Sequence, residues 1–485
     1  MICMVVGLVG LKWLLTRANW WLYVSKLGDK QYSLPPGDMG LPLIGSMWTF
    51  LRYFKTRRPD SFIGSFIKRY GRTGLYKTVL FGHPCVLATA PETLKKVLTD
   101  DDAFQSGWPK ATIELMGKKS FAAISYEDHK RLRKLTATPI KGHDALSVYL
   151  EYIEEITKTN LEKWIDMGPI EFLTELRKLT FKIIVHICLS EESEPIMNAL
   201  EKEYTTLNAG LRAMAIDIPG FAYHKARKAR KNIVAILQSV VNNRRNRRKN
   251  NIPSKGKDMM DRLLDVEDEK GDKLGDDDLI DIMLMYLNAG HESSGHTLMW
   301  AVILMQNHPE VLKKATEEQK LIVERRPSTQ KGVNLKEIRE MVYLNQIINE
   351  TSRYVSFSLM AFRETKKDVN INGYFIPKGW KVLAWFRGVH MDPQIYPNPK
   401  EFNPSRFEDY IPKPCSFIPF GAGTRFCPGY DLAKLEISIF LHYYLLGYEI
   451  KRLNPKSSLV YLPHSRPADN CLAIVKKQNP WSSSG

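Results

Sequence analysis

The sequence FGAGTRFCPG, residues 420–429, says more about the fold than any other stretch of the chain. It places one cysteine, Cys427, in a loop with three glycines and an arginine, directly before an amphipathic segment, 431–446, that predicts a helix. Glycine permits positive φ angles and close backbone approach, so this loop can bend tightly beneath a flat ligand. The charge of Arg425 and the amides at the start of the helix favour a nearby anion, and we expect them to lower the pKa of the thiol. A thiolate held in this way is a suitable ligand for an iron porphyrin.

Taken alone, Cys427 could equally be an inert, buried small side chain. The loop, however, matches F-x-x-G-x-R-x-C-x-G at every fixed position, and this pattern resembles the haem-binding signature of the cytochrome P450 superfamily. The resemblance implies haem b as cofactor, with Cys427 as the iron ligand and Phe420, Arg425 and Gly429 beside it. It also implies a mainly α fold with small β-sheets, the cytochrome P450 fold, in which a long central helix passes over the haem.

The composition is that of a globular protein, with 485 residues of which 44% are hydrophobic and 25% charged. We find no repeat and no interior linker, so we expect one large domain over residues 46–480. The six cysteines show no C-x-x-C spacing, which argues against a zinc site and a disulfide scaffold. The net charge of +17 favours an acidic partner, a membrane face or a nucleic acid. We interpret the densest basic runs, 224–231 and 244–249, as solvated helix surface rather than a nucleic-acid site, because no aromatic residues alternate with them.

An apolar segment, residues 2–15, begins the chain and is followed by Trp20 and Trp21. Positive residues flank its carboxyl side and no small-residue cleavage site follows. This pattern predicts an uncleaved membrane anchor over residues 1–25, with the catalytic domain facing the cytosol. The apolar run is shorter than the ~20 residues of a spanning helix, so peripheral attachment is an alternative. The proline-rich end of residues 26–45 predicts an extended hinge, and it resembles the hinge of superfamily members at the endoplasmic reticulum membrane.

A long helical pattern covers residues 276–307, beginning with acidic residues and ending before Pro309. At ~1.5 Å per residue such a helix is roughly 45 Å long and can cross a whole domain. Its centre carries AGHESS, residues 289–294, where glycine and serine weaken a helix. A small-residue contact between two helices is one interpretation. The stretch also resembles the superfamily's oxygen-activation motif, A-G-x-[D/E]-T, which implies that Glu292 and Ser293 deliver protons, with serine replacing the usual threonine.

Glu350 and Arg353 lie three residues apart, so a helix would place them on one face. In isolation they would be a routine surface ion pair. They resemble the superfamily's E-x-x-R motif, and Arg406 in FNPSRF would complete an Arg–Glu–Arg network. The resemblance implies a structural role, behind the cysteine loop.

His129 and Arg133 lie four residues apart and match the W-x-x-x-R pattern of the helix that contacts the haem propionates, with histidine replacing tryptophan. Arg363 matches a third propionate donor. The remaining cations of that helix are expected to point outward, and as a hypothesis they dock the acidic face of a flavin reductase. These cations are Lys130, Arg131 and Lys134.

Stretches such as LNAGHESSGHTLMWA and YLPHSRPADNCLA are similar to the plant ent-kaurenoic acid oxidases. The resemblance implies a monooxygenase of gibberellin biosynthesis that oxidises ent-kaurenoic acid in successive steps toward gibberellin A12. Its electrons would come from NADPH through a separate FAD/FMN protein, NADPH-cytochrome P450 reductase. Candidate substrate contacts are Ala289, Val355 and Leu359, with Arg212 as a cation for the carboxylate.

Two alternatives remain at this point. One is a hydroxylase of the same clan that acts on a triterpene of the β-amyrin type or on another diterpenoid, because the sequence departs from the oxidases at residues 352–355 and before Cys427. The other, of a different class, is a non-catalytic haem-binding protein or a basic nucleic-acid-binding protein.

Overall fold

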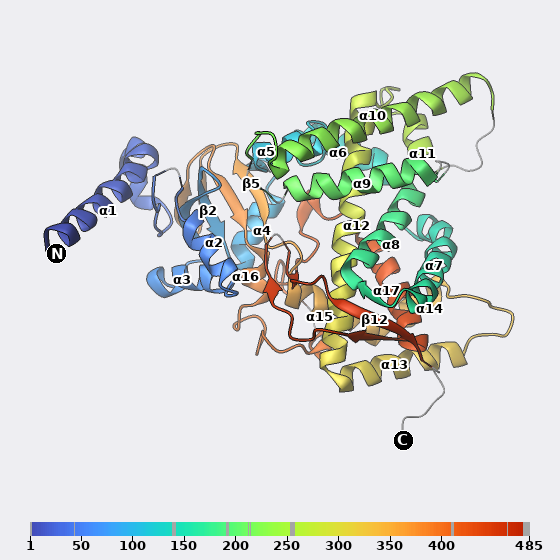
Figure 1. Ribbon diagram of the computed structural model, residues 1–485. Coiled ribbons are helices and arrows are strands. Elements are labelled where there is room, and N and C mark those ends of the chain that lie inside the picture. Colours follow the sequence, from blue (N-terminus) through green and yellow to red (C-terminus); the bar gives the residue numbers. More distant parts are fainter. Residues whose placement is uncertain are drawn as a thin grey trace.

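The computed structural model describes residues 2–42, 44–137, 142–190, 194–211, 213, 215–252, 258–408, 412–462 and 464–478. Helices dominate it, with the largest sheet to one side and a small sheet containing β12 against the helices, in agreement with the predicted fold class (Figure 1). The α-helices in these residues are α1 (Ile2–Tyr23), α2 (Met47–Lys55), α3 (Ser61–Tyr70), α4 (Pro91–Thr99), α5 (Lys110–Met116), α6 (Tyr126–Ala137), α7 (His143–Asp166), α8 (Phe172–Leu189), α9 (Glu194–Leu211), α10 (Ala222–Lys249), α11 (Met259–Asp265), α12 (Asp276–Asn307), α13 (Pro309–Glu324), α14 (Leu335–Glu340), α15 (Val342–Val355), α16 (Phe386–His390) and α17 (Tyr430–Gly447). The strands are β1 (Leu75–Leu80), β2 (His83–Ala88), β3 (Phe104–Ser106), β4 (Pro169–Glu171), β5 (Ala361–Thr365), β6 (Val369–Ile371), β7 (Tyr374–Ile376), β8 (Lys381–Ala384), β9 (Tyr448–Arg452), β10 (Leu459–Val460), β11 (Arg466–Pro467) and β12 (Leu472–Lys477).

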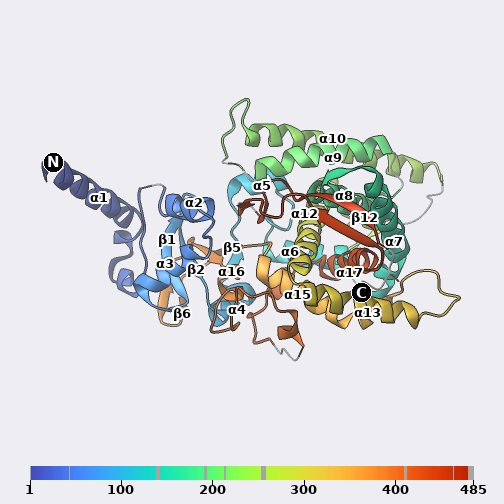
Figure 2. The same ribbon diagram turned by 60° about the horizontal axis from the view of Figure 1, so that its bottom comes forward.

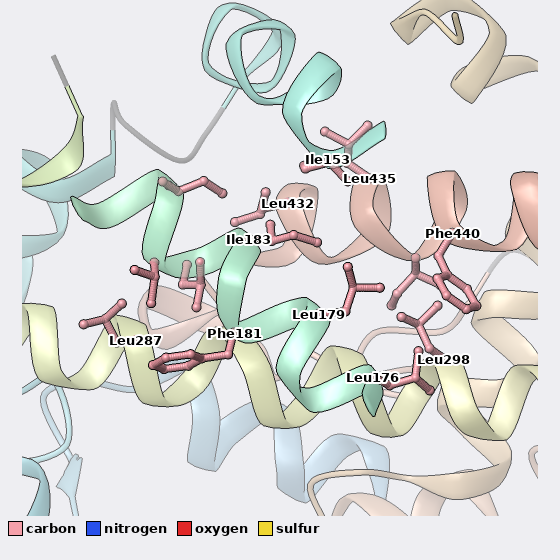
Figure 3. Close-up of a cluster of buried hydrophobic side chains, with 14 of the residues drawn as sticks. Ile153, Leu176, Leu179, Phe181, Ile183, Leu287, Leu298, Leu432, Leu435 and Phe440 are labelled. Atoms are coloured by element: carbon pink, nitrogen blue, oxygen red, sulfur yellow. The ribbon is translucent and has the colours of Figure 1, made fainter. Parts of the chain in front are cut away.

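The main hydrophobic core forms where α8 packs between α12 and α17 (Figure 3). Leu176, Leu179 and Phe181 of α8 are buried there. Leu298 of α12 and Phe440 of α17 meet them. Burying a large apolar side chain contributes about 1.5–3 kcal/mol, so this contact fixes α12 relative to the helix that follows the cysteine loop.

Helix α12 is a single 32-residue helix and confirms the long helix predicted from the sequence. Its first turn carries three aspartates, which suits the positive end of the helix dipole. It ends at Asn307, because His308 precedes a proline and leaves the helical region, with φ −130° and ψ 81°.

A five-stranded sheet in the order β1-β2-β8-β5-β3 lies beside the helical core. Strands β2 and β8 are parallel and the other neighbours are antiparallel. Figure 2 shows α2, α3 and α4 around this sheet. The sheet positions Arg363, which lies opposite Ser106 on β3 and Val382 on β8.

Helix α1 projects from the sheet side of the molecule (Figure 1). The sequence predicted a membrane-spanning anchor here, but none of the helices in the described ranges is both long enough and apolar enough to cross a membrane. The physical reason lies in the sequence, since Lys12 interrupts the apolar run and Arg17 and Asn19 follow it within the same helix. After α1, Pro36 accepts a hydrogen bond from the Lys77 amide of β1 at 3.0 Å, so the proline-rich segment lies against the sheet.

Candidate active site

The cysteine loop follows a path that favours glycine at two positions. Gly421 and Gly423 have φ angles of 76° and 73°, in the left-handed region that favours glycine. A Cβ atom on Gly423 would lie 2.2 Å from the carbonyl oxygen of Leu98. The amide of Cys427 donates to the Phe420 carbonyl at 3.0 Å and closes the loop.

The Cys427 side chain is half-buried, just before α17. Burial raises the pKa of its thiol, and the opposing effects of the Gly429 amide and the Arg133 charge are smaller. The sequence-based expectation of a lowered thiol pKa was therefore wrong, because desolvation of the sulfur outweighs its polar neighbours. A metal ion deprotonates a thiol that coordinates it, so a thiolate at this position depends on the metal rather than on the loop.

Three arginines from different elements surround His129, which is buried on α6. Burial, followed by the charges of Arg425, Arg133 and Arg363, lowers the pKa of His129 to about 3. Burial and Arg425 also lower the pKa of Arg363 to about 10. Within the described residues, Nδ1 of His129 has no hydrogen-bond partner. The sequence-predicted residues thus form a strongly positive cluster with a buried, unused histidine nitrogen, which suits an anionic ligand.

Backbone carbonyls hold two of these arginines in place, and one of the carbonyls belongs to the cysteine loop. Arg425 donates to the carbonyl of Phe121 at 2.8 Å. Arg133 donates to the carbonyl of Phe426 at 2.7 Å. The cluster and the cysteine loop are therefore one connected unit.

The centre of α12 presents one accessible face. Ala289 is exposed and Ser293 is half-exposed, while His291, Glu292 and Ser294 are buried. The Ser293 hydroxyl donates to the Ala289 carbonyl at 3.2 Å. The opposite face is packed, since a Cβ on Gly290 would lie 2.6 Å from Ile184 of α8. Gly290 thus allows two helices to pack closely, whereas Ala289 leaves an open surface. Of the two interpretations of residues 289–294, the helix contact therefore applies to Gly290, and the open surface expected of an oxygen-activation motif is at Ala289.

Glu292 points into a polar cluster between α8 and α12. Its Oε2 lies 3.1 Å from Nη2 of Arg177 and 3.7 Å from Nδ1 of His296, and its Oε1 lies 3.9 Å from Nε2 of His291. Burial places the pKa of His296 well below its ordinary value, and the charges of Arg177 and His464 lower it further. His296 is therefore neutral, and the cation that faces Glu292 is Arg177. Nothing in the local sequence pattern pointed to Arg177, because it comes from another helix.

A second buried acid was also missed by the sequence analysis. Glu436 of α17 accepts a hydrogen bond from the hydroxyl of Ser294 on α12. Burial raises the pKa of Glu436 to about 8, while the hydrogen bond from Ser294 acts in the opposite direction. The sequence around Glu436 predicts an amphipathic helix, and a single acidic residue in such a helix normally lies on the solvent face, so nothing marked Glu436 as buried. This hydrogen bond joins the long helix to the helix behind the cysteine loop.

The structure brings Glu350, Arg353 and Arg406 together. Arg353 donates to both carboxylate oxygens of Glu350 at 2.7 Å, and both side chains are fully buried. Arg406 donates to Glu350 Oε1 at 3.0 Å. Arg353 also donates to the carbonyls of His390 and Pro399, so the network links α15 to the end of α16 and to the segment that follows it.

The candidate substrate residues are more scattered. Val355 ends α15 and packs against the main core, whereas Leu359 packs against the separate cluster around α2, α3 and the sheet. Ala289 lies on the accessible face of α12. Arg212 lies outside the described residues.

The cations of α6 do not all point outward as the sequence suggested. Nε of Arg131 lies 2.6 Å from Asp268, and Nζ of Lys134 lies 2.7 Å from Glu269. Asp268 is held in a tight turn, where its other carboxylate oxygen accepts from the amides of Lys270 and Asp272. The carboxylate of this turn therefore neutralises Arg131 within the chain.

Comparison with known proteins identifies the class. Residues 35–462 match the model of the cytochrome P450 family, and the chain belongs to this family. It is 62% identical to ent-kaurenoic acid oxidase 2 of Arabidopsis thaliana, over 98% of this chain and 97% of that protein. It is 52% identical to 7,8-epoxymelianol synthase CYP88A154 of Ailanthus altissima, over 96% and 93%. Among solved structures it resembles retinoic acid-bound cyanobacterial CYP120A1, with a TM-score of 0.81 and 27% identity over 92% and 99% of the chains.

Family membership implies a haem iron cofactor and electrons from a separate reductase. The residues present fit such a group. A cysteine in a bent loop is available to the iron, and a cluster of three guanidinium groups with an unused histidine nitrogen suits the two propionates. The accessible face of α12 at Ala289 suits a flat ring and a small substrate.

Proposed function

We propose that the chain is a haem-thiolate monooxygenase that oxidises ent-kaurenoic acid in successive steps toward gibberellin A12. The single observation that carries the substrate is the 62% identity to an Arabidopsis ent-kaurenoic acid oxidase over 98% of the chain. Rice and barley proteins named ent-kaurenoic acid oxidase, at 52% and 53% identity, support the same assignment.

The predicted haem-binding residues each have a role in this proposal. Cys427 binds the iron, and Arg133, Arg363, Arg425 and His129 hold the propionates. When bound, the haem supplies the iron at which dioxygen is activated, and thiolate ligation favours O–O cleavage. Phe420 and Gly429 shape the loop around the sulfur.

Glu292 and Ser293 move protons toward the reacting oxygen. Glu292 is held by Arg177 at 3.1 Å, on the packed side of α12. The Ser293 hydroxyl, bonded to the Ala289 carbonyl, lies on the accessible side. A proton on Glu292 therefore needs rotation of the carboxyl group, or a chain of water, to reach the side of Ser293.

Electrons come from NADPH through a flavin-containing reductase, which docks on the outward cations of α6. Lys130 and Lys134 are exposed, Lys134 in a solvent-facing ion pair with Glu269, whereas Arg131 is half-buried against Asp268. We assign the enzyme to the surface of the endoplasmic reticulum membrane. The exposed tryptophans of α1 and α2 support this location, with Trp13, Trp21 and Trp48 exposed by 55%, 64% and 70%, since such rings favour the membrane–water interface.

The test is turnover. The full chain with haem, a plant reductase and NADPH should convert ent-kaurenoic acid to more oxidised acids, read by mass spectrometry. Cys427→Ser should give no product and should lose the red-shifted Soret band of the reduced, carbon monoxide-treated protein. Loss of turnover with that band intact in Cys427→Ser would refute the ligand assignment.

A second candidate substrate follows from the relatives. The 52% identity to 7,8-epoxymelianol synthase equals that to the rice oxidase. Melianol in the same assay therefore tests this alternative. Preferred oxidation of melianol over ent-kaurenoic acid would overturn the proposed substrate while leaving the proposed reaction type in place.

A further inference from the structure

A cavity of about 550 Å³ lies where α5, α10 and the first turns of α12 meet. Figure 1 shows the beginning of α10 passing over α5, close to the first turns of α12. The volume falls within the roughly 300–1,000 Å³ of small-molecule sites. No predicted site residue lines this cavity.

The cavity is lined by five basic side chains and three acidic ones. Two of the acids already have partners. Asp281 accepts from Nη2 of Arg230 at 2.7 Å and from the Lys119 amide at 2.9 Å. Glu114 accepts from the hydroxyl of Tyr223 at 2.7 Å. The acids therefore leave an excess of positive charge facing the cavity.

Two lysines and one nitrogen of Arg230 in the lining residues lack a partner among the described residues. Lys118 and Lys231 are exposed and line the cavity, and neither has a carboxylate within 4.0 Å in the described part of the chain. Nε of Arg230 is buried without a hydrogen-bond partner among the described residues. An anion in the cavity would accept charge-assisted hydrogen bonds from the two exposed lysines.

The rest of the lining is apolar. Val234 of α10 and Ile280 of α12 contribute to the wall, together with the aliphatic stems of the lysines. Such a wall suits a ligand with an anionic head and a hydrocarbon body better than it suits a bare inorganic anion.

We propose that this cavity is a second binding site for a terpenoid carboxylic acid, distinct from the site over the haem. The identity of the acid rests on the proposed function, which makes acids of this class both substrate and product. Asp281 precedes Ala289 by eight residues, about 12 Å along the helix axis. An acid held here is thus outside the reaction position, and the site retains substrate or product near the enzyme.

The test counts bound acid on the full haem-containing chain. Equilibrium dialysis with labelled ent-kaurenoic acid gives the total number of bound molecules, and the shift of the haem Soret band reports the site beside the iron. The wild type should bind two molecules, of which one shifts the band. Lys118→Gln/Lys231→Gln should weaken the second site at least tenfold and leave the Soret titration unchanged.

Matched controls keep the proposal falsifiable. Lys225→Gln/Lys228→Gln removes the same charge from exposed positions of α10 that do not line the cavity, and it should still bind two molecules. The methyl ester of the acid should bind only beside the iron. Retention of the second molecule by Lys118→Gln/Lys231→Gln, or binding of the ester at both sites, would refute the site.

Inorganic phosphate serves as the third probe. If phosphate displaced the second molecule at a concentration equal to that of the acid, the cavity would be a simple anion site. That result would overturn the terpenoid assignment. A missing Soret shift with ent-kaurenoic acid would instead refute the proposed function, while dialysis would still count the second site.

Discussion

Glu436 shows how one buried acid can couple stability to pH. Its pKa is raised to about 8 by burial, whereas a glutamate in an unfolded chain titrates near 4.3. Between these values the folded state holds a proton that the unfolded state has lost. The free energy of unfolding contributed by Glu436 therefore falls as the pH rises from about 4.3 to about 8.

The variant Glu436→Gln tests this coupling. Glutamine keeps the volume and can accept from Ser294, but it does not titrate, so the decline of stability with pH should become shallower. Urea unfolding of wild type and variant at about pH 5.5 and about pH 7.5 measures it. Identical slopes in the two proteins would contradict a protonated Glu436.

Glu292 is the residue at which we expect the largest catalytic effect. Glu292→Gln keeps the shape of the side chain but removes its transferable proton and the charge that faces Arg177. Turnover should therefore fall by about 10²-fold, which is the usual contribution of a positioned general acid. The variant should consume NADPH with little product, and its haem content and Soret band should stay unchanged. If the variant formed as much product per NADPH consumed as the wild type, Glu292 would not be the proton donor.

At the scale of elements, the Glu350 network connects α15 to the segments beyond α16. Glu350→Ala leaves Arg353 buried without its carboxylate, and breaking a buried pair costs about 3–5 kcal/mol. We expect this loss in urea unfolding, accompanied by haem loss. Arg353→Lys should not rescue stability, because lysine lacks the bidentate geometry.

The matched control is the exposed ion pair of Lys336 and Glu340, which lie four residues apart on the same face of α14. Lys336→Ala should change the free energy of unfolding by less than about 0.5 kcal/mol. Equal losses in Glu350→Ala and Lys336→Ala would show that the buried network does not hold these elements together.

Helix α6 and the turn at Asp268 together determine which cations a reductase can meet. Lys130→Glu/Lys134→Glu should slow reduction of the haem by NADPH and the reductase, with a smaller difference at high salt because exposed charges are screened. Haem content should not change. Stopped-flow reduction measures the rate, with Lys225→Glu/Lys228→Glu on α10 as the control, and equal rates in both double variants would reject docking on α6.

At the scale of the whole molecule, local sequence predicted the elements that depend on neighbouring residues. The bounds of α12 followed from its acidic start and from Pro309, and the cysteine loop followed from its glycines. The sequence did not predict contacts between residues that are distant in the chain, such as that of Arg177 with Glu292 and that of Asp268 with Arg131. The direction of the thiol pKa was missed because burial is a property of the folded chain.

The hydrogen bonds of Asn19 also act on the whole molecule. This fully buried side chain of α1 donates to the carbonyls of Met39, Gly40 and Leu41, at 2.9, 3.1 and 2.5 Å. These hydrogen bonds fix α1 against the segment that runs beside β1, so the helix is not a flexible extension of the chain. In the proposed membrane-bound enzyme, the orientation of α1 relative to the rest of the chain would therefore be set during folding, and an electron donor on the same membrane surface would meet one fixed face of the protein.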